Sequence, residues 1–326
     1  MFITNIIWIL DTKCNLSCPH CYVHKRNWEV KISKERALRL IEEAKELSIK
    51  GIDFTGGEPL LVKEVFEYIE KARSLGLEVS LNSNALLLNK EIARFLKDNE
   101  VYLYVSIDGS NKDVFEKMRG KDNFDRLLNS IELINKFEIP FSVIFSISSL
   151  NYFDASNMVR FAKNIGAREL CMIPVIPSGE AKNTRIYIGS DLLIRTIREV
   201  SEEAEREKYP VVLWCVPFMK SMNFNYVVID ECHVLDYIDL APTGDIMLCD
   251  VIDMPLSEIR TKSLLEALKE VEQNKLYNLL KERDKLCLGC NVATFCKGGC
   301  YARAYILEND ISKPDPYCPK VLSPSR

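Results

Sequence analysis

The chain has 326 residues, of which 47% are hydrophobic and 28% are charged, so it can bury a sizeable core in one large domain plus a small one. Its net charge of -4 gives no reason to expect a nucleic-acid partner, and no apolar run approaches the length of a membrane span. Twelve cysteines without a secretion signal indicate reduced, metal-bound thiols and a cytoplasmic protein, rather than disulfides.

The first apolar run, at residues 6–10, predicts a strand, and a short loop after it carries Cys14, Cys18 and Cys21. Soft thiolate ligands suit iron–sulfur clusters, and a loop of this length can curl round one face of a cluster. A cube of four irons would then keep one iron without a protein ligand. The alternative is a zinc knuckle, in which His24 supplies the fourth ligand.

From residue 1 to about residue 180, short β-rich runs alternate with amphipathic helices, which predicts parallel βα units. The next strands are predicted at residues 51–55, 77–81, 101–107, 141–147 and 169–175. The helices picked out by their apolar spacing are residues 33–47, 62–76, 153–165 and 190–208. Six βα units predict the α/β class with an open, partial (β/α)6 TIM-like barrel, whose chemistry belongs at the C-terminal mouth of the strands.

Several candidate residues follow the predicted strands directly. They are Gly56, Gly57, Glu58, Asn82, Ser106 and, in the next helix, Arg119. Each has a simpler explanation: Gly56 to Pro59 as a strand-to-helix turn, Asp108-Gly109 as a turn after Ser106, and Arg119 as a solvated helix charge.

After about residue 208 the βα rhythm gives way to short β segments and cysteines, so we predict a domain boundary that separates residues 1–209 from residues 210–326. The second part carries a row of seven cysteines: Cys232, Cys249, Cys287, Cys290, Cys296, Cys300 and Cys318. A zinc ribbon could use only the run from Cys287 to Cys300 and would leave the other three unexplained.

The C-x3-C-x2-C loop and the Gly-Gly-Glu-Pro stretch resemble the radical S-adenosylmethionine (radical SAM) superfamily. The later cysteine row resembles the seven-cysteine SPASM signature, a small C-terminal domain with auxiliary clusters. Together these resemblances cover almost the whole chain. They imply a 4Fe-4S cluster at Cys14, Cys18 and Cys21, whose open iron chelates SAM, and two auxiliary iron–sulfur clusters, expected to be 4Fe-4S.

The resemblance also implies roles for single residues. Gly56 and Gly57 would let the backbone approach SAM, Glu58 would receive its ammonium group, Ser106 would help to hold it, and Arg119 would pair with its carboxylate. Asn82 is a candidate for hydrogen bonds to the ribose or to the methionine end of SAM.

For the auxiliary clusters, the resemblance implies an inner cluster on Cys232, Cys249 and Cys300 and an outer one on Cys287, Cys290, Cys296 and Cys318. The inner cluster is either closed by Cys215 or open to substrate. Asp250 matches an aspartate that accepts the substrate proton in sulfatase-maturating enzymes. A helix cap or a surface acid is the alternative for Asp250.

The resemblance implies that SAM is cleaved reductively to a 5′-deoxyadenosyl radical, which takes a hydrogen atom from the substrate. Our leading hypothesis is oxidative maturation of a peptide or protein, with a separate peptide-recognition domain as partner. The second is oxidation or decarboxylation of a tetrapyrrole side chain. The third is a non-catalytic electron-transfer protein. Both enzymatic hypotheses need a reducing partner such as ferredoxin or flavodoxin.

Overall fold

The computed structural model describes residues 3–24, 26, 28, 30–232 and 235–322. Their strands form a single sheet of 11 strands in the order β11-β10-β9-β1-β2-β3-β4-β5-β6-β7-β8. The strands are β1 Asn5–Ile9, β2 Gly51–Thr55, β3 Glu78–Ser83, β4 Tyr102–Ser106, β5 Phe141–Ile147, β6 Leu170–Pro174, β7 Val211–Leu213, β8 Val227–Ile229, β9 Tyr237–Leu240, β10 Asp245–Cys249 and β11 Ile252–Glu258.

The strands from β1 to β8 are parallel to their neighbours, and β9 also pairs with β1 in parallel. Only β10 and β11 join the described sheet in antiparallel fashion. The predicted α/β fold with a partial (β/α)6 TIM-like barrel is therefore confirmed. The sheet is longer than the six predicted strands, because β7 and β8 extend it at one end and β9, β10 and β11 extend it at the other.

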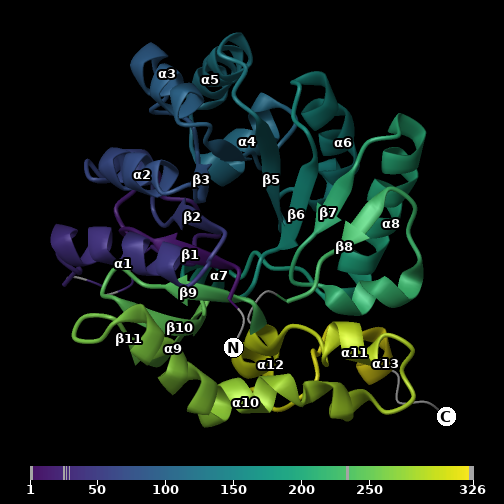
Figure 1. The fold of residues 1–326 in the computed structure, drawn as a ribbon. Coiled ribbons are helices and arrows are strands. Elements are labelled where there is room, and N and C mark those ends of the chain that lie inside the picture. Colours follow the sequence, from purple (N-terminus) through teal and green to yellow (C-terminus); the bar gives the residue numbers. More distant parts are fainter. Residues whose placement is uncertain (1–2, 25, 27, 29, 233–234, 323–326) are drawn as a thin grey trace.

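The described α-helices are α1 Lys34–Glu46, α2 Val65–Ser74, α3 Lys90–Asp98, α4 Lys112–Arg119, α5 Phe124–Lys136, α6 Ala155–Asn164, α7 Glu180–Thr184, α8 Ser190–Glu207, α9 Leu264–Gln273, α10 Lys275–Lys281, α11 Ala293–Cys296, α12 Tyr301–Glu308 and α13 Pro319–Leu322. Short 3-10 turns lie at Pro59–Leu61, Tyr152–Asp154, Pro217–Met222 and Arg283–Cys287. Helices α10 to α13 gather at one end of the molecule, below the strands (Figure 1).

The predicted helix starts are correct where a cap residue marks them. Ser33 caps α1 through a hydrogen bond from the Arg36 backbone N–H to its hydroxyl. The helix predicted from Val62 instead begins at Val65, because residues 59–61 form a 3-10 turn first. Among the described residues, we find no helix with the length and apolar character that a bilayer crossing requires.

Alternate residues of the central strands separate the core from the barrel interior. Phe54, Leu81 and Leu103 lie side by side in register and are buried in the main core. Their neighbours Asp53, Ser80 and Tyr102 also pair in register but are only half-buried, so we place them on the interior face.

A second, smaller core lies in the cysteine-rich end of the chain. Its buried members are Ile176, Leu248, Cys249, Val251, Ile252, Leu280, Cys300, Tyr301, Ala302 and Ile311. Two of the predicted cluster ligands, Cys249 and Cys300, therefore lie in an apolar setting. The boundary near residue 210 stays a prediction, although the same sheet continues across it through β7 and β8.

Candidate functional site

The N-terminal cysteine loop leaves the C-terminal end of β1, at the mouth of the barrel. Cys18 is buried, and Cys14 and Cys21 are half-buried. The backbone N–H groups of Leu16 and His24 point at the sulfurs of Cys14 and Cys21, at 3.4 and 3.2 Å. Burial raises the pKa of the Cys18 thiol to about 11, the nearby Arg119 opposes this, and Cys14 and Cys21 raise it further. The three thiols therefore share one small region.

Gly56 and Gly57 lie against the backbone that leads into this loop. Their segment is held by hydrogen bonds from Gly57 N–H to the Asp11 carbonyl (2.8 Å) and from Glu58 N–H to the Lys13 carbonyl (2.9 Å). A Cβ atom would lie 2.5 Å from the Asp11 oxygen at Gly56 and 2.1 Å from the Lys13 oxygen at Gly57. The chain's own packing thus requires both glycines, whatever they contribute to a cofactor site.

Glu58 is 1% exposed, and its carboxylate is occupied by neighbouring groups. It accepts hydrogen bonds from the Leu60 N–H (3.1 Å), the Ser83 hydroxyl (2.8 Å) and the Asn84 N–H (2.9 Å). Burial raises the pKa of Glu58, and these hydrogen bonds oppose the shift. The carboxylate therefore joins the end of β3 to the Gly-Gly-Glu turn beside the cysteine loop.

Asp108, a turn residue in one of the sequence interpretations, is the centre of a polar cluster that sequence reasoning missed. It is fully buried, and it accepts hydrogen bonds from Arg119 Nε (2.5 Å) and from the Ser146 N–H (2.6 Å). Nε2 of His20 lies 3.4 Å from its carboxylate. Asp108 thus links the cysteine loop to the ends of β4, α4 and β5.

Arg119 comes close to the cysteine loop as well as to Asp108. Its Nη1 lies 3.8 Å from the Cys18 sulfur, and its side chain is 11% exposed. The alternative of a freely solvated helix charge is therefore wrong for this residue.

Burial lowers the pKa of His20 to about 4, with Asp108 opposing, so this imidazole is neutral at physiological pH.

Asn82, at the end of β3, presents an unused acceptor to the barrel interior. Its Nδ2 donates to Asp53 Oδ2 at 2.8 Å, whereas its buried Oδ1 has no partner among the described residues. A buried, unpaired amide oxygen suits a ligand that brings a donor, such as a ribose hydroxyl or an ammonium group. Ser106 lies at the corresponding end of β4. The residues present here fit a bound SAM.

Asp250 and Tyr22 meet where the cysteine loop faces the C-terminal region. Tyr22 is hydrogen-bonded to the Asp250 carboxylate; burial and this carboxylate together raise the pKa of Tyr22 well above its usual value. The Asp250 N–H donates to Asp239 Oδ2 at 3.0 Å, and Arg26 Nη1 donates to the Asp250 carbonyl at 2.6 Å. Sequence reasoning found Asp250 but not these partners, of which Tyr22 and Arg26 lie more than 200 positions away in the chain.

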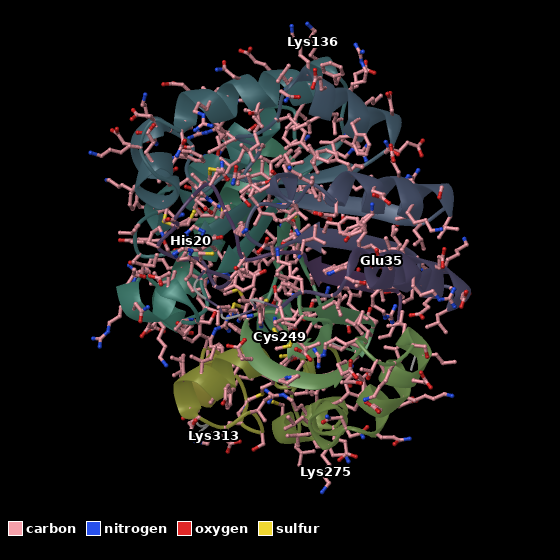
Figure 2. The ribbon with its side chains drawn as sticks, turned by 90° about the vertical axis from the view of Figure 1, so that its left-hand side faces the viewer. His20, Glu35, Lys136, Cys249, Lys275 and Lys313 are labelled. Atoms are coloured by element: carbon pink, nitrogen blue, oxygen red, sulfur yellow. The ribbon has the colours of Figure 1, made fainter. Side chains whose placement is uncertain are left out.

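The thiols of Cys215, Cys232, Cys249 and Cys300 form one group. Burial, and then the charges of Cys300 and Cys232, raise the pKa of Cys215 well above its usual value. The pKa of Cys249 is also raised well above its usual value, first by burial and then by the charges of Asp250, Asp239 and Cys215. Cys215 therefore lies beside the three cysteines of the predicted inner set. Figure 2 shows Cys249 between His20 and the C-terminal helices.

The remaining four C-terminal cysteines form a second group. Burial raises the pKa of Cys287, and the charges of Cys318 and Cys290 add to the effect. Burial raises the pKa of the Cys296 thiol to about 12, and the charges of Cys318 and Cys287 add to the shift. This grouping agrees with the ligand sets that the SPASM resemblance implies, in which Cys318 belongs with Cys287, Cys290 and Cys296.

Neither group is closed around a single ion. Tetrahedral zinc with Zn–S distances of about 2.3 Å holds its sulfur ligands roughly 3.8 Å apart. Among the described residues, only Asp239, Cys249 and Asp250 bring three possible ligand atoms within 4.8 Å of one another. In the described part of the chain, therefore, neither group of thiols is arranged as a closed zinc site.

The fold and these cysteine groups define a class of enzyme. Residues 8–162 match the Radical SAM superfamily, so this part of the chain is a radical SAM domain. That the cysteine-rich region after it is of the SPASM type stays a prediction from the sequence. The cofactors of a radical SAM domain are SAM and a 4Fe-4S cluster.

Relatives that match most of the chain are named for heme formation. An AdoMet-dependent heme synthase of Methanosarcina barkeri is 25% identical over 96% of this chain and 95% of its own length. An enzyme of the same name from Oleidesulfovibrio alaskensis is 22% identical over 96% and 86%. An Fe-coproporphyrin III synthase of Methanosarcina barkeri is 23% identical over 96% and 87%.

Solved structures with the same fold include enzymes whose structures were determined with bound peptides. SuiB of Streptococcus suis, solved with S-adenosylmethionine, superposes with a TM-score of 0.75 and 16% identity, over 97% of this chain and 77% of SuiB. The enzyme anSMEcpe, solved with AdoMet and a peptide, gives a TM-score of 0.76 and 19% identity over 99% and 95%. At this identity the likeness establishes the fold alone.

Proposed function

We propose that the chain oxidises a side chain of a tetrapyrrole, most simply by radical decarboxylation of a carboxyalkyl group. The observation that carries this proposal is the match of almost the full chain to enzymes named for heme and iron-coproporphyrin synthesis. It reverses the order of the two enzymatic hypotheses drawn from the sequence. Peptide maturation becomes the second candidate, because only the fold of SuiB and anSMEcpe supports it.

The proposed cofactor ligands are those that the sequence predicts. Cys14, Cys18 and Cys21 hold the cluster that binds SAM. The residues assigned to SAM itself are Gly56, Gly57, Glu58, Asn82, Ser106 and Arg119. In support, Arg119 lies beside Cys18 and the Asn82 acceptor is unused.

For the auxiliary clusters we propose complete protein ligation. Cys215, Cys232, Cys249 and Cys300 hold the inner one, and Cys287, Cys290, Cys296 and Cys318 hold the outer one. The proximity of Cys215 to Cys232 and Cys300 supports the closed alternative over an open iron. We also propose a ferredoxin or flavodoxin as reductant. A cytoplasmic location stays a prediction from the reduced thiols.

The interior face of the barrel supports a flat, aromatic substrate. Tyr102 and Tyr104 on β4 have ring centroids 5.2 Å apart, and Trp214, after β7, packs edge-on against Tyr104 at 5.8 Å. The three rings are only half-buried, and the Arg168 guanidinium lies over the ring of Tyr102, 5.6 Å from its centroid. Tyr104 and Trp214 are therefore the rings proposed to stack on a macrocycle.

When bound, SAM and its cluster supply a radical that removes one hydrogen atom from the substrate. In an oxidative decarboxylation, the carboxylate would leave as CO2 and a carbon–carbon double bond would form. The one remaining electron would need an acceptor, which an auxiliary cluster held by the C-terminal cysteines would supply. No proton has to be accepted in this sequence. A base at Asp250 therefore belongs to the peptide-maturation alternative, in which a substrate proton is removed together with the electron.

The test is anaerobic turnover of the reconstituted protein with SAM, dithionite and iron coproporphyrin III. We expect formation of 5′-deoxyadenosine, and a porphyrin product that has lost CO2 and two hydrogens per reacting side chain by mass spectrometry. A porphyrin that returns unchanged while 5′-deoxyadenosine accumulates would reject the tetrapyrrole proposal. Without any 5′-deoxyadenosine, the electron-transfer alternative would be favoured.

A further inference from the structure

Arg303 is a fully buried cation in the cysteine-rich region. It lies on α12, three residues after Cys300, and its side chain is 0% exposed. Its Nη1 donates to Oδ2 of Asp315, which is also 0% exposed, at 2.6 Å. A buried guanidinium is tolerated only when it is paired, so these two residues must be considered together.

The Arg303–Asp315 pair touches segments that carry both groups of thiols. Nη2 of Arg303 donates to the Cys215 carbonyl at 3.1 Å, and Asp315 Oδ2 accepts from the Cys300 N–H at 2.9 Å. The guanidinium also stacks on the ring of Tyr317, at 4.4 Å, and Tyr317 directly precedes Cys318. The pair therefore lies at the junction between the inner and the outer group.

One donor of Arg303 is unused. Its Nε is buried and has no hydrogen-bond partner among the described residues, although the other two nitrogens are bonded. A buried N–H that stays unpaired destabilises the folded state, so a partner is expected for it. The backbone N–H of the same residue donates to the Cys300 sulfur at 3.4 Å, as the N-cap bond of α12, so Arg303 lies next to this ligand in the fold.

We infer that Arg303 Nε donates an N–H···S hydrogen bond to the inner auxiliary cluster, and that the Arg303–Asp315 pair tunes the reduction potential of this cluster. Reduction adds negative charge, which a buried guanidinium stabilises and a buried carboxylate opposes. Hydrogen bonds to cluster sulfurs act in the same direction as the guanidinium. Arg303 thereby favours transfer of the substrate electron to this cluster.

This inference rests on the proposed ligation of the inner cluster by Cys215, Cys232, Cys249 and Cys300. The test compares Arg303→Gln and Asp315→Asn in the reconstituted protein, by redox titration followed with electron paramagnetic resonance. We expect Arg303→Gln to lower the midpoint potential and Asp315→Asn to raise it. A tenfold change in the equilibrium constant for reduction corresponds to about 59 mV for a one-electron couple.

The opposite signs separate an electrostatic role from a structural one. If both variants keep their iron and shift the potential in the same direction, or do not shift it, the inference is wrong. Arg303→Lys keeps the positive charge but loses the branched guanidinium, so its midpoint potential should lie between those of wild type and Arg303→Gln. It carries the test if Arg303→Gln fails to hold iron. Failure of the ligand proposal is distinguishable, because the wild-type protein would then lack the inner-cluster spectrum, or Cys215→Ser would leave that spectrum unchanged.

Discussion

Asn82 faces the barrel interior. The Nδ2 of its side-chain amide is hydrogen-bonded, whereas its Oδ1 has no partner among the described residues. Asp53 accepts from its Nδ2, and this fixes the direction in which Oδ1 points. Asp53 is itself held by the Ser80 hydroxyl at 2.9 Å. A carboxylate that fixes the amide of a neighbouring strand positions a cofactor contact without touching the cofactor.

Replacement of Asn82 by Ala should weaken SAM binding about tenfold, the usual effect of losing one buried hydrogen bond. Asp53→Ala should have a smaller effect in the same direction, because the amide remains but is free to rotate. Calorimetric titration of the anaerobic protein with SAM measures both. Ser80→Ala is the matched control, since it removes a bond to Asp53 and leaves Asn82 in place. Equal affinities for wild type and Asn82→Ala would contradict the assignment.

Asp53 should also make stability depend on pH. Burial raises the pKa of its carboxyl to about 6, the bonds from Ser80 and Asn82 oppose this, and the charges of Asp250 and Asp239 add to it. Because the folded pKa lies above the unfolded value of 3.8, the folded state binds the extra proton between these values. The stabilisation is present below about pH 4 and is lost as the pH rises through 6.

Asp53→Asn should therefore be more stable than wild type at pH 7.5, by roughly 1–2 kcal/mol, since no charge is buried. The difference should shrink at pH 5, where wild-type Asp53 is largely protonated. Thermal unfolding of the holoprotein at the two pH values measures this. If the stability difference between Asp53→Asn and wild type is the same at both pH values, the Asp53 carboxyl is not the titrating group.

At the scale of elements, the turn between β2 and α2 and the loop after β1 are fitted to each other through Gly57. Gly57→Ala would place a Cβ 2.1 Å from the Lys13 carbonyl oxygen, a backbone atom that cannot move without displacing the cysteine loop. We expect a loss of about 2–5 kcal/mol and lower iron content. Gly189→Ala is the control, because nothing lies within 4 Å of the added atom there. Comparable losses in both variants, in unfolding and iron assays, would reject this explanation.

The elements that sequence patterns predict well are those that local chemistry determines. The strand at residues 141–147 and the cap at Ser33 are found as predicted, because alternation and a capping hydroxyl are readable within a few residues. The three-residue strands β7 and β8 are too short to show a period. Their place follows from pairing with β6, which no local pattern contains.

The candidate site divides in the same way. The spacing of the cysteines and of the glycine pair predicts their roles, because it can be read from a short stretch of sequence. Asp108, Asp53 and Arg303 were not predicted, because their importance depends on burial and on partners from other strands or helices. The signals for Asp108 were its place directly after a predicted strand and its Ser-x-Asp-Gly spacing from Ser106, and a turn explained it equally well.

At the scale of the whole molecule, the inner cluster joins the segment after β7 to β10 and α12 through its proposed ligands. Cys215→Ser should therefore lower the iron content below the roughly twelve irons of three 4Fe-4S clusters. Cys171→Ala, at a fully buried position in β6, should retain the wild-type amount. Iron counting after anaerobic reconstitution measures both. Full iron and an unchanged spectrum in Cys215→Ser would return the inner cluster to the open alternative.

The pairing of β1 with β9 joins residues that are more than 200 positions apart in the chain, Asn5 with Tyr237 and Trp8 with Leu240. During synthesis, the first strand must wait with one side unpaired until about three quarters of the protein has left the ribosome. An open edge of this kind invites pairing with other chains. Fragments that end near residue 209 should accordingly self-associate, and metal loading of the first cysteine loop in the cell should follow completion of the chain rather than precede it.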